Sequence, residues 1–235
     1  QYVECTHEYW RSNGKFTPNI TLRLASGGYI GGGLYHSQNL EGALTTLPGA
    51  RIVCPSFADD AAGLLRTSMR SKGFTLYLEP KALYNSVEAA AVVPEEFEVP
   101  FGKARIRREG TDLTIITYGN TTHFCLDVAE RLAREGVGSV EVIDLRSLIP
   151  LDKEAIFASV RKTGKVMVVH EDKVFSGFGA EIAAQIAGEM FRYLDAPVQR
   201  VGSTFTPVGF NPVLERAILP NDEKIYKAAK ELLEF

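Results

Sequence analysis

Cysteine is scarce in this chain, and its three residues, Cys5, Cys54 and Cys125, lie far apart. An odd number at this spacing fits neither a disulfide framework nor a zinc site. We therefore expect small buried residues in a reducing compartment, which is the cytoplasm, or the mitochondrial matrix in a eukaryote. The sequence also lacks any apolar run of about 18 residues that could cross a bilayer. Its first residues lack the basic and then apolar order of a secretory signal, so we expect no membrane contact.

A strong excess of one charge is missing as well. The formal net charge is -3, with 45% hydrophobic and 23% charged residues, which is ordinary for a globular protein. No basic run is interleaved with aromatic residues, so the composition predicts no nucleic-acid surface. The chain does not begin with Met and opens on what resembles the end of a helix. We expect it to be part of a longer protein.

The second half of the chain alternates predicted strands and helices. β-Branched or apolar runs predict strands at 113–118, 140–145, 165–170 and 198–201. Apolar residues at helical spacing predict helices at 121–136, 152–160, 177–190 and 222–235. This alternation is typical of an α/β fold with a mainly parallel sheet flanked by helices and right-handed crossovers.

The first half shows the same alternation of strands and helices less completely. It predicts strands at 20–24, 51–54 and 76–78 and a helix at 59–70, too few strands for an independent α/β layer. Between the halves, Ser86 to Pro100 holds two prolines, four glutamates and no basic residue. We therefore predict an incomplete first domain at 1–85, a linker at 86–110 and a second domain at 111–235.

A histidine directly after a glycine run is the first candidate for chemistry. In the sequence from Gly31 to Gln38, His36 follows three glycines and is flanked by Tyr35, Ser37 and Gln38. Histidine exchanges a proton near neutrality because its ordinary pKa is about 6.5, and glycines allow close approach of the backbone to a ligand. Ser37 and Gln38 could orient the ring or a substrate. By itself, a histidine in a loop is more often a surface residue than a catalytic one.

Other candidates have structural alternatives. The run from Ser176 to Gly179 could hold a phosphate at a helix start, although tight packing of the turn is the favoured interpretation. His170, Glu171 and Asp172 follow a predicted strand, where α/β folds place ligands, but a structural histidine there is equally reasonable. We expect Glu79 and Lys81 to form a surface ion pair. His7 and His123 have no partners at metal-ligand spacing, so both are expected to be structural or exposed.

Taken in order, these segments resemble a known family. The residues that carry the resemblance are Gly33–Gln38, Pro48-Gly49, Val53–Ser56, Gly63–Leu65, Leu78–Lys81 with Leu83-Tyr84, Glu141–Arg146, Pro150, His170-Glu171, Gly177-Phe178 and Ala196-Pro197. The chain resembles the transketolase-like β subunit of the E1 component of 2-oxo acid dehydrogenase complexes, of the pyruvate, branched-chain or acetoin type. The resemblance implies part of a domain that binds the thiamine pyrimidine, followed by a transketolase C-terminal-like domain.

The resemblance also implies a reaction and a role for His36. In this family thiamine diphosphate drives oxidative decarboxylation of a 2-oxo acid, and the acyl group passes to a lipoyl group on E2. The cofactor lies between an α subunit, which holds the diphosphate through Mg²⁺, and the β subunit. By this match His36 gives or takes a proton during acyl transfer, with Tyr35, Ser37 and Gln38 near substrate or cofactor. The family's glutamate that activates the aminopyrimidine lies well upstream of the histidine motif, before the position of Gln1, so we expect this chain alone to bind the cofactor poorly and to be inactive.

Further ligands and partners follow from the same resemblance. Some members hold K⁺ through backbone carbonyls, and the matching positions are Pro18, Ile20, Thr21, Ser68, Ser71 and Gly73. The C-terminal domain is expected to pair with a second β copy, and the end at Phe235 to meet the E2 subunit-binding domain. One alternative is a non-catalytic module for dimerisation and E2 docking. A second alternative is another transketolase-like enzyme, which the Tyr35–Gln38 and Leu78–Lys81 segments disfavour. Asn39 and Leu40 do not discriminate among 2-oxo acids.

Overall fold

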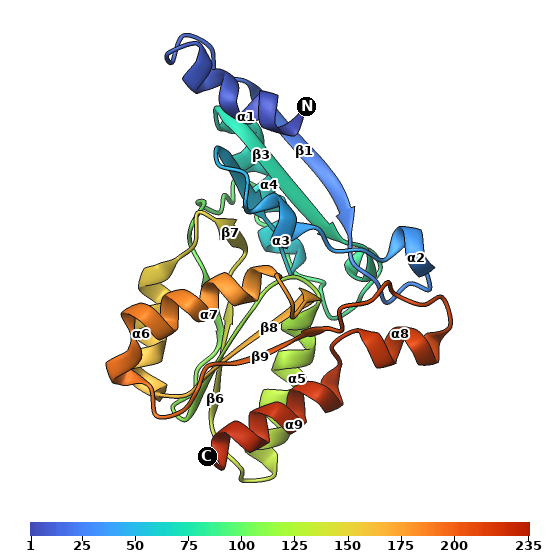
Figure 1. Cartoon of the computed structure of the whole chain (residues 1–235), viewed down its shortest axis with the longest axis vertical. Helices are drawn as coiled ribbons and strands as arrows, with labels where there is room; N and C mark the ends of the chain where they lie inside the picture. Colours follow the sequence, from blue (N-terminus) through green and yellow to red (C-terminus); the bar gives the residue numbers. More distant parts are fainter.

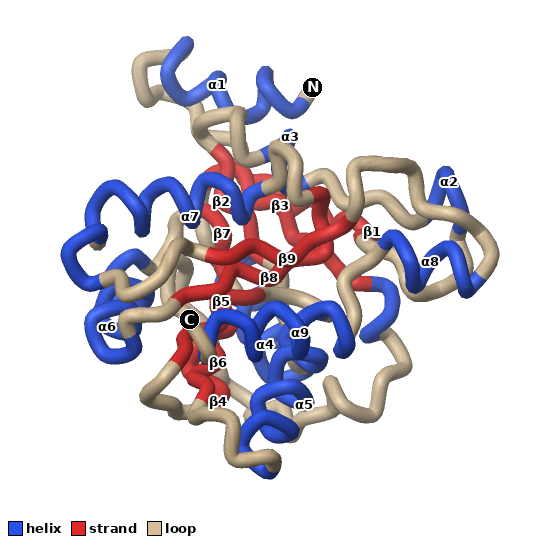
Figure 2. Tube along the Cα trace, turned by 60° about the horizontal axis from the view of Figure 1, so that its bottom comes forward, coloured by secondary structure: helices blue, strands red, loops and turns tan.

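Two β-sheets joined through a shared core form the body of the molecule. The computed structural model describes residues 1–235. The first sheet has the strand order β1-β3-β2-β7 and the second the order β4-β6-β5-β8-β9. Strands run through the middle of the molecule and helices cover them from outside (Figure 2). The α/β class and the mainly parallel sheets flanked by helices are therefore confirmed.

The elements alternate along the chain, as the sequence predicts. In order they are α1 (Tyr2–Arg11), β1 (Asn19–Ser26), α2 (Gly33–His36), α3 (Glu41–Leu44), β2 (Ala50–Val53), α4 (Ala58–Arg70), β3 (Gly73–Pro80), η1 (Lys81–Leu83), β4 (Arg105–Arg108), β5 (Leu113–Thr117), α5 (Thr121–Arg134), β6 (Val140–Asp144), β7 (Ser147–Ile149), α6 (Lys153–Thr163), β8 (Val166–Lys173), α7 (Phe178–Glu189), η2 (Phe191–Tyr193), β9 (Gln199–Ser203), α8 (Pro212–Ile218) and α9 (Asp222–Leu233). Figure 1 shows α1 at one end of the molecule and α9 at the other.

Local chemistry explains where several of these elements begin and end. The side chain of Asn221 accepts a hydrogen bond from the Lys224 amide at 3.1 Å and caps α9. Asp152 does the same for α6, accepting from Ala155 N at 3.1 Å. Gly164 ends α6 in the left-handed region at φ 65°, which costs glycine little. Every residue of β5 and β6 is buried, as expected for strands covered on both faces.

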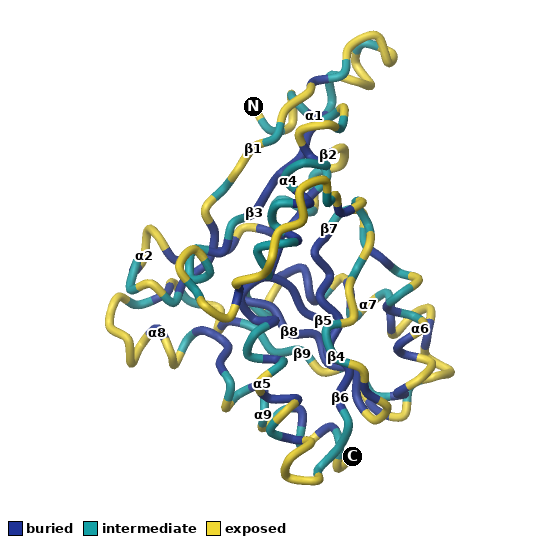
Figure 3. The backbone as a smooth tube through the Cα atoms, turned by 180° about the vertical axis from the view of Figure 1, so that it is seen from behind, coloured by how far each residue is buried: buried dark blue, intermediate teal, exposed yellow.

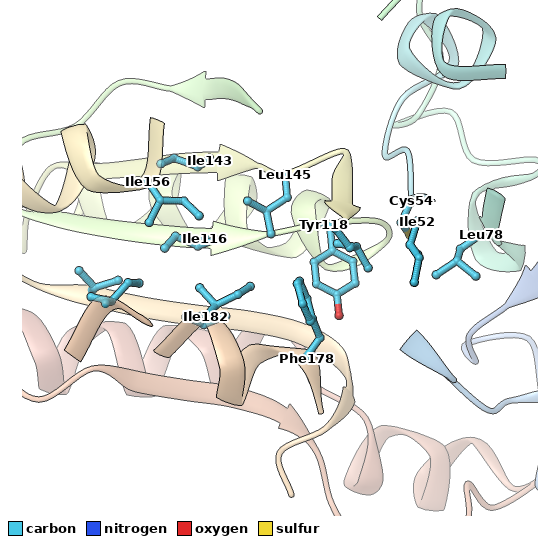
Figure 4. Close-up of a cluster of buried hydrophobic side chains, with 14 of the residues drawn as sticks. Ile52, Cys54, Leu78, Ile116, Tyr118, Ile143, Leu145, Ile156, Phe178 and Ile182 are labelled. Atoms are coloured by element: carbon cyan, nitrogen blue, oxygen red, sulfur yellow. The ribbon is translucent and has the colours of Figure 1, made fainter. Parts of the chain in front are cut away.

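One hydrophobic core connects the two sheets. Ile52 and Leu76 of the first sheet belong to the same buried cluster as Ile116 and Ile143 of the second. Figure 4 shows Tyr118 between these two groups of side chains. The two halves of the chain therefore pack as one body around a continuous core.

Two short strands cross the sequence boundary between the halves. Within the predicted linker at 86–110, β4 pairs antiparallel with β6, and β7 from the second half pairs antiparallel with β2 of the first sheet. The sequence predicts neither strand, nor the short helices α2, α3 and α8. No helix of the structure is both long enough and apolar enough to cross a membrane.

Candidate functional site

The glycine-rich segment places His36 at the end of the short helix α2, on the surface. Gly31 and Gly33 have positive φ angles of 64° and 60°, which bring the chain abruptly into this helix. The His36 side chain is exposed and makes no hydrogen bond within the chain. Its ring nitrogens are therefore free to contact a molecule from outside.

Exposed apolar side chains lie on α2 beside His36 and on the neighbouring segment around α8. Tyr35 is 87% and Leu34 is 53% exposed. Helix α8 lies beside α2 in both views of the backbone (Figures 1 and 2), and a Cβ on Gly33 would lie 3.4 Å from Phe210. We call the exposed apolar residues of α2, of α8 and of their flanking segments the apolar rim, together with Phe175, whose ring packs on Phe205 at 4.8 Å between centroids: Ile30, Leu34, Tyr35, Leu40, Phe175, Phe205, Phe210, Val213 and Leu214. Figure 3 shows this side of the molecule as largely exposed. A large exposed apolar surface indicates a binding site.

The two residues after His36 turn inward. Ser37 is buried, and its Oγ has no hydrogen-bond partner. Gln38 donates from Nε2 to the Leu34 carbonyl at 3.1 Å and accepts from Lys173 Nζ at 2.9 Å. The four residues predicted around the site thus divide into two that face outward, Tyr35 and His36, and two that are less exposed, of which Gln38 fixes the segment.

Buried carboxylates lie beneath the His36 segment. Burial, together with the nearby Asp172, raises the pKa of Glu41 to about 7. Burial also raises the pKa of Glu171 to about 8, although the Gly28 amide opposes the shift. A cavity of about 10 Å³ separates these groups and is lined by Asn39, Glu41, Tyr118 and Glu171, among others. The Tyr118 hydroxyl donates to Glu41 Oε1 at 3.2 Å.

His170 is a buried structural residue. Both of its ring nitrogens lack a hydrogen-bond partner, and burial lowers its pKa to about 4. A Cβ on Gly179 would overlap this imidazole, and one on Gly177 would lie 2.8 Å from it. The glycines of the run from Ser176 to Gly179 therefore allow α7 to pack on His170, so tight packing, the favoured interpretation, is confirmed.

The remaining candidates lie apart from His36. His123 hydrogen-bonds through Nε2 to the Ser56 carbonyl at 2.8 Å, and the His7 ring contacts Trp10 edge-on at 5.6 Å between centroids. No group of three or more His, Cys, Asp or Glu residues is arranged to hold a metal. Cys54 and Cys125 are buried, Cys5 is half-buried, and all three are free.

The expected ion pair between Glu79 and Lys81 is wrong. Glu79 pairs instead with Arg23 of the neighbouring strand and accepts from the Tyr84 hydroxyl at 2.8 Å. The reason is the parallel pairing of β1 with β3, which brings Arg23 beside the end of β3. Lys81 begins η1, and burial lowers its pKa.

The backbone positions predicted for K⁺ come from two neighbouring segments. The register aligns Asn19 with Gly73, which brings the start of β1 next to the turn between α4 and β3. Arg51 donates from Nη2 to the Lys72 carbonyl at 2.6 Å in the same region. A fixed guanidinium there would compete electrostatically with a second cation. The K⁺ site stays a prediction.

The end of the chain at Phe235 lies apart from α2, which carries His36, in both backbone views (Figures 1 and 2). Its side chain is 73% exposed and borders a groove of about 680 Å³. The groove is lined by small and apolar side chains of α7 and its surroundings: Ala180, Ala183, Ala184, Ala187, Phe191, Leu194, Ala196, Pro197 and Val198. The docking role of Phe235 stays a prediction.

Sequence reasoning missed how the His36 segment is held. Glu41, Asp172 and Lys173 all contact it or its flanks, and only Asp172 was a candidate, as part of a possible ligand site at a strand end. The available signal was the polar run from His170 at the end of a strand, together with isolated glycines at 27, 28 and 42. Nothing in the sequence connects these two segments, which lie 130 or more positions apart.

Comparison with known proteins places the chain among enzymes of one kind. The family model "Transketolase, C-terminal domain" matches residues 102–225. The chain is 40% identical over 227 residues to the 2-oxoisovalerate dehydrogenase subunit beta of Bacillus subtilis (strain 168), covering 96% of this chain and 69% of that protein. It is 39% identical over 226 residues to the pyruvate dehydrogenase E1 component subunit beta of the same organism, with the same coverage. The corresponding protein of Staphylococcus aureus (strain Mu50 / ATCC 700699) is 41% identical over 226 residues, covering 96% of this chain and 69% of that one.

A solved structure confirms the fold. The chain is similar to a protein titled "Split gene transketolase, inactive beta4 tetramer" with a TM-score of 0.72 and 23% identity, covering 99% of this chain and 74% of that one. At this identity the likeness speaks for the fold alone.

Proposed function

The chain belongs to the family of E1 β subunits of 2-oxo acid dehydrogenase complexes, and we propose that it contributes His36 to the acyl-transfer step of such an enzyme. The observation that carries the proposal is an exposed histidine without an internal partner, presented by a glycine turn within an apolar rim. The substrate class is a 2-oxo acid, and the acceptor is a lipoyl group on E2. Relatives named for pyruvate and for 2-oxoisovalerate lie at nearly equal identity, so the proposal does not select between these acids.

The residues present fit the β-subunit side of a thiamine diphosphate site. Tyr35 and Leu34 offer apolar surface to a planar ring, and His36 adds a group that exchanges protons. Bound thiamine diphosphate supplies the electron sink that decarboxylation requires. The diphosphate and Mg²⁺ are assigned to the α subunit. The carboxylates of Glu41 and Glu171 are buried beneath the segment, so neither is assigned to the aminopyrimidine.

In this proposal His36 holds and moves a proton while the surrounding residues control its environment. The ring donates or accepts a proton while the acyl unit passes to the lipoyl sulfur. Tyr35 and Leu34 exclude water once a partner covers them, which strengthens electrostatic contacts at the ring. Gln38 keeps the segment in place through its hydrogen bonds with Leu34 and Lys173.

The partner proposed for the apolar rim is the E1 α subunit. The rim contains four exposed aromatic side chains, of Tyr35, Phe175, Phe205 and Phe210. Aromatic residues are enriched in the centres of protein interfaces. Because His36 lies within this surface, a subunit that binds the rim would also enclose the histidine.

A second surface supports the proposal of further partners. The alanines at 180, 183, 184 and 187 share one face of α7, and they let another backbone approach closely. We assign this face to a second β copy. The exposed Phe235 beside it is assigned to the E2 subunit-binding domain. The proposed compartment is the cytoplasm, or the mitochondrial matrix in a eukaryote, in accord with three free cysteines.

The test is to replace His36 with alanine in the assembled enzyme and to measure two half-reactions separately. Decarboxylation is followed with an artificial electron acceptor, and acylation is followed on the lipoyl domain. We expect acylation to fall at least about a hundredfold, in the range of general acid–base catalysis, with a smaller loss in the first assay. His7→Ala, a histidine on α1, is the matched control and should leave both rates unchanged. Unchanged acylation in His36→Ala would remove the histidine from the mechanism.

The alternative function is a non-catalytic module for dimerisation and E2 docking. The groove on α7 with Phe235 is the observation that favours it. Sedimentation with and without the E2 subunit-binding domain, combined with a thiamine diphosphate titration in the presence of the α subunit, separates the two functions. A chain that docks but never contributes to cofactor binding supports the module.

A further inference from the structure

Three consecutive residues at the end of β8 hold the segment that carries His36. Glu171 Oε1 accepts from the Gly28 amide at 2.5 Å, and Asp172 Oδ2 accepts from the Gly42 amide at 3.0 Å. Lys173 Nζ donates to Gln38 Oε1 at 2.9 Å. One strand end in the second sheet thus contacts the His36 segment on both sides of the histidine.

The glycines at these contacts show how closely the two segments approach. A Cβ on Gly27 would lie 2.7 Å from Glu171 Oε1, and the φ of this residue is 83°. A Cβ on Gly42 would lie 2.8 Å from Asp172 Oδ2. Real Cβ atoms do not come so near to a carboxylate, so only glycine lets the backbone reach these oxygens. Both carboxylates are buried, which makes their hydrogen bonds costly to lose.

The turn itself is held by the segment around α8. Glu215 Oε1 accepts from the Gly31 amide at 3.3 Å, and the Tyr29 hydroxyl donates to the Pro220 carbonyl at 2.6 Å. Every one of these anchors comes from the second half of the chain. His36 and Tyr35 project outward between the contacts at Gly31 and Gln38.

The side chain of Glu171 contacts the glycine turn, whereas other groups hold its own strand in the sheet. The backbone of β8 pairs with β9, and Ser203 Oγ donates to the Glu171 carbonyl. The strand is therefore fixed by its neighbour, while the carboxylate contacts the glycine turn. Removing the carboxylate should loosen the turn and leave the sheet intact.

We propose that Glu171 is the positioning residue for His36, with Asp172 and Lys173 fixing the downstream side of the same segment. The proposal rests on the proposed role of His36 in acyl transfer and deepens it. Glu171 does not touch the reacting atoms in this scheme. It sets the place of the turn from which His36 projects, so that catalytic geometry depends on how the second half packs against the first.

The decisive experiment is amide hydrogen exchange of residues 27–38 in Glu171→Ala and Glu171→Gln. Glutamine keeps an oxygen that accepts from the Gly28 amide, whereas alanine does not. We expect exchange of these amides to become about ten- to a hundredfold faster in Glu171→Ala and less than about threefold faster in Glu171→Gln. Glu141→Ala is the matched control, because Glu141 is equally buried in the same sheet but contacts Ser159 and Lys162. Unchanged exchange in Glu171→Ala, or an equal rise at 27–38 in Glu141→Ala, would overturn the proposal.

A kinetic measurement separates positioning from general damage. In the assembled enzyme we expect Glu171→Ala to lower kcat for lipoyl acylation at least about tenfold, with the KM for the lipoyl domain nearly unchanged, and Glu171→Gln to restore most of kcat. An equal loss in both variants contradicts a positioning role.

If Glu171→Ala does not fold, Lys173→Met tests the downstream side, because its partly exposed side chain is replaced at similar length. Amide hydrogen exchange at residues 36–42 must then become faster for the proposal to hold. The exchange results do not depend on catalysis. A failure of His36 in acylation would therefore refute the proposed function without deciding whether Glu171 positions the segment.

Discussion

Arg146 and Asp60 form a buried ion pair between the two halves of the chain, with Nη1 of the arginine 2.7 Å from Oδ1 of the aspartate. Asp60 lies on α4 of the first half and Arg146 follows β6 of the second. Arg107 joins the same aspartate and also contacts Asp144 Oδ2 at 2.7 Å. Arg146 in addition donates from Nη2 to the Lys103 carbonyl at 2.8 Å. The halves that together present His36 are therefore connected by charge as well as by a common core.

Breaking this network from one side should be expensive. Asp60→Ala leaves the guanidinium groups of Arg107 and Arg146 largely buried without their shared carboxylate, so we expect a loss of about 3–5 kcal/mol in the free energy of unfolding. Urea denaturation followed by circular dichroism measures it. Asp222→Ala, which removes the exposed ion pair of Asp222 with Arg216, should cost less than about 1 kcal/mol. Similar losses in the two variants would show that the buried network contributes little.

Acid should destabilise the protein through His170. The folded pKa is about 4, below the ordinary value of 6.5, so the unfolded chain binds a proton in a range where the folded chain does not. The resulting stability is present above pH 6.5 and is lost as the pH falls to 4, by about 3 kcal/mol in total. His170→Leu, which carries no titratable group, should flatten the free energy of unfolding against pH in this window. A curve as steep as that of the parent chain would assign the acid sensitivity to other residues.

The fold was largely predictable from the sequence because its signal is local. β5, β6 and β8 are apolar runs, and α4, α5 and α9 carry apolar residues at helical spacing, so their existence follows from hydrophobic patterning. The strands β4 and β7 escaped prediction for a physical reason. β4 is an arginine-rich edge strand and β7 is only three residues long, so both depend on tertiary pairing that a local pattern does not record.

The candidate site was predictable only in its exposed part. His36 stands in a recognisable run of residues, and the structure shows it exposed and free. The residues beneath it act through contacts between distant segments, such as Glu171 with Gly28, at a separation of 143 positions. A buried acid that accepts a backbone hydrogen bond has no sequence pattern of its own. The ion pair of Glu79 with Arg23 was missed for the same reason, since strand register decides it.

Raising the pH should weaken the fold through the buried acid Glu41. Its folded pKa of about 7 lies above the ordinary 4.5, so its contribution is complete below pH 4.5 and is lost as the pH rises through 7. The shift of the Glu41 pKa corresponds to about 3 kcal/mol. Glu41→Gln keeps an oxygen to accept from Asn39 and Tyr118 but has no proton to lose. We expect this variant to be more stable than the parent chain at pH 8, and the gain in stability to be smaller at pH 5. Thermal unfolding at the two pH values measures the difference.

Two glycines of α7 should respond in opposite directions to the same substitution. Gly179→Ala places a methyl group against the His170 ring, which must shift although it is fully buried. Forcing extra volume into such a site costs about 1–3 kcal/mol. Gly188→Ala, in the same helix, meets nothing within 4 Å. It should stabilise by about 0.5–1 kcal/mol, because alanine loses less backbone freedom than glycine on entering a helix. Denaturant midpoints of the two variants measured side by side give the answer. If Gly179→Ala matched Gly188→Ala, the contact between α7 and His170 would not be as tight as the structure shows, and the explanation of the run from Ser176 to Gly179 as a packing feature would be wrong.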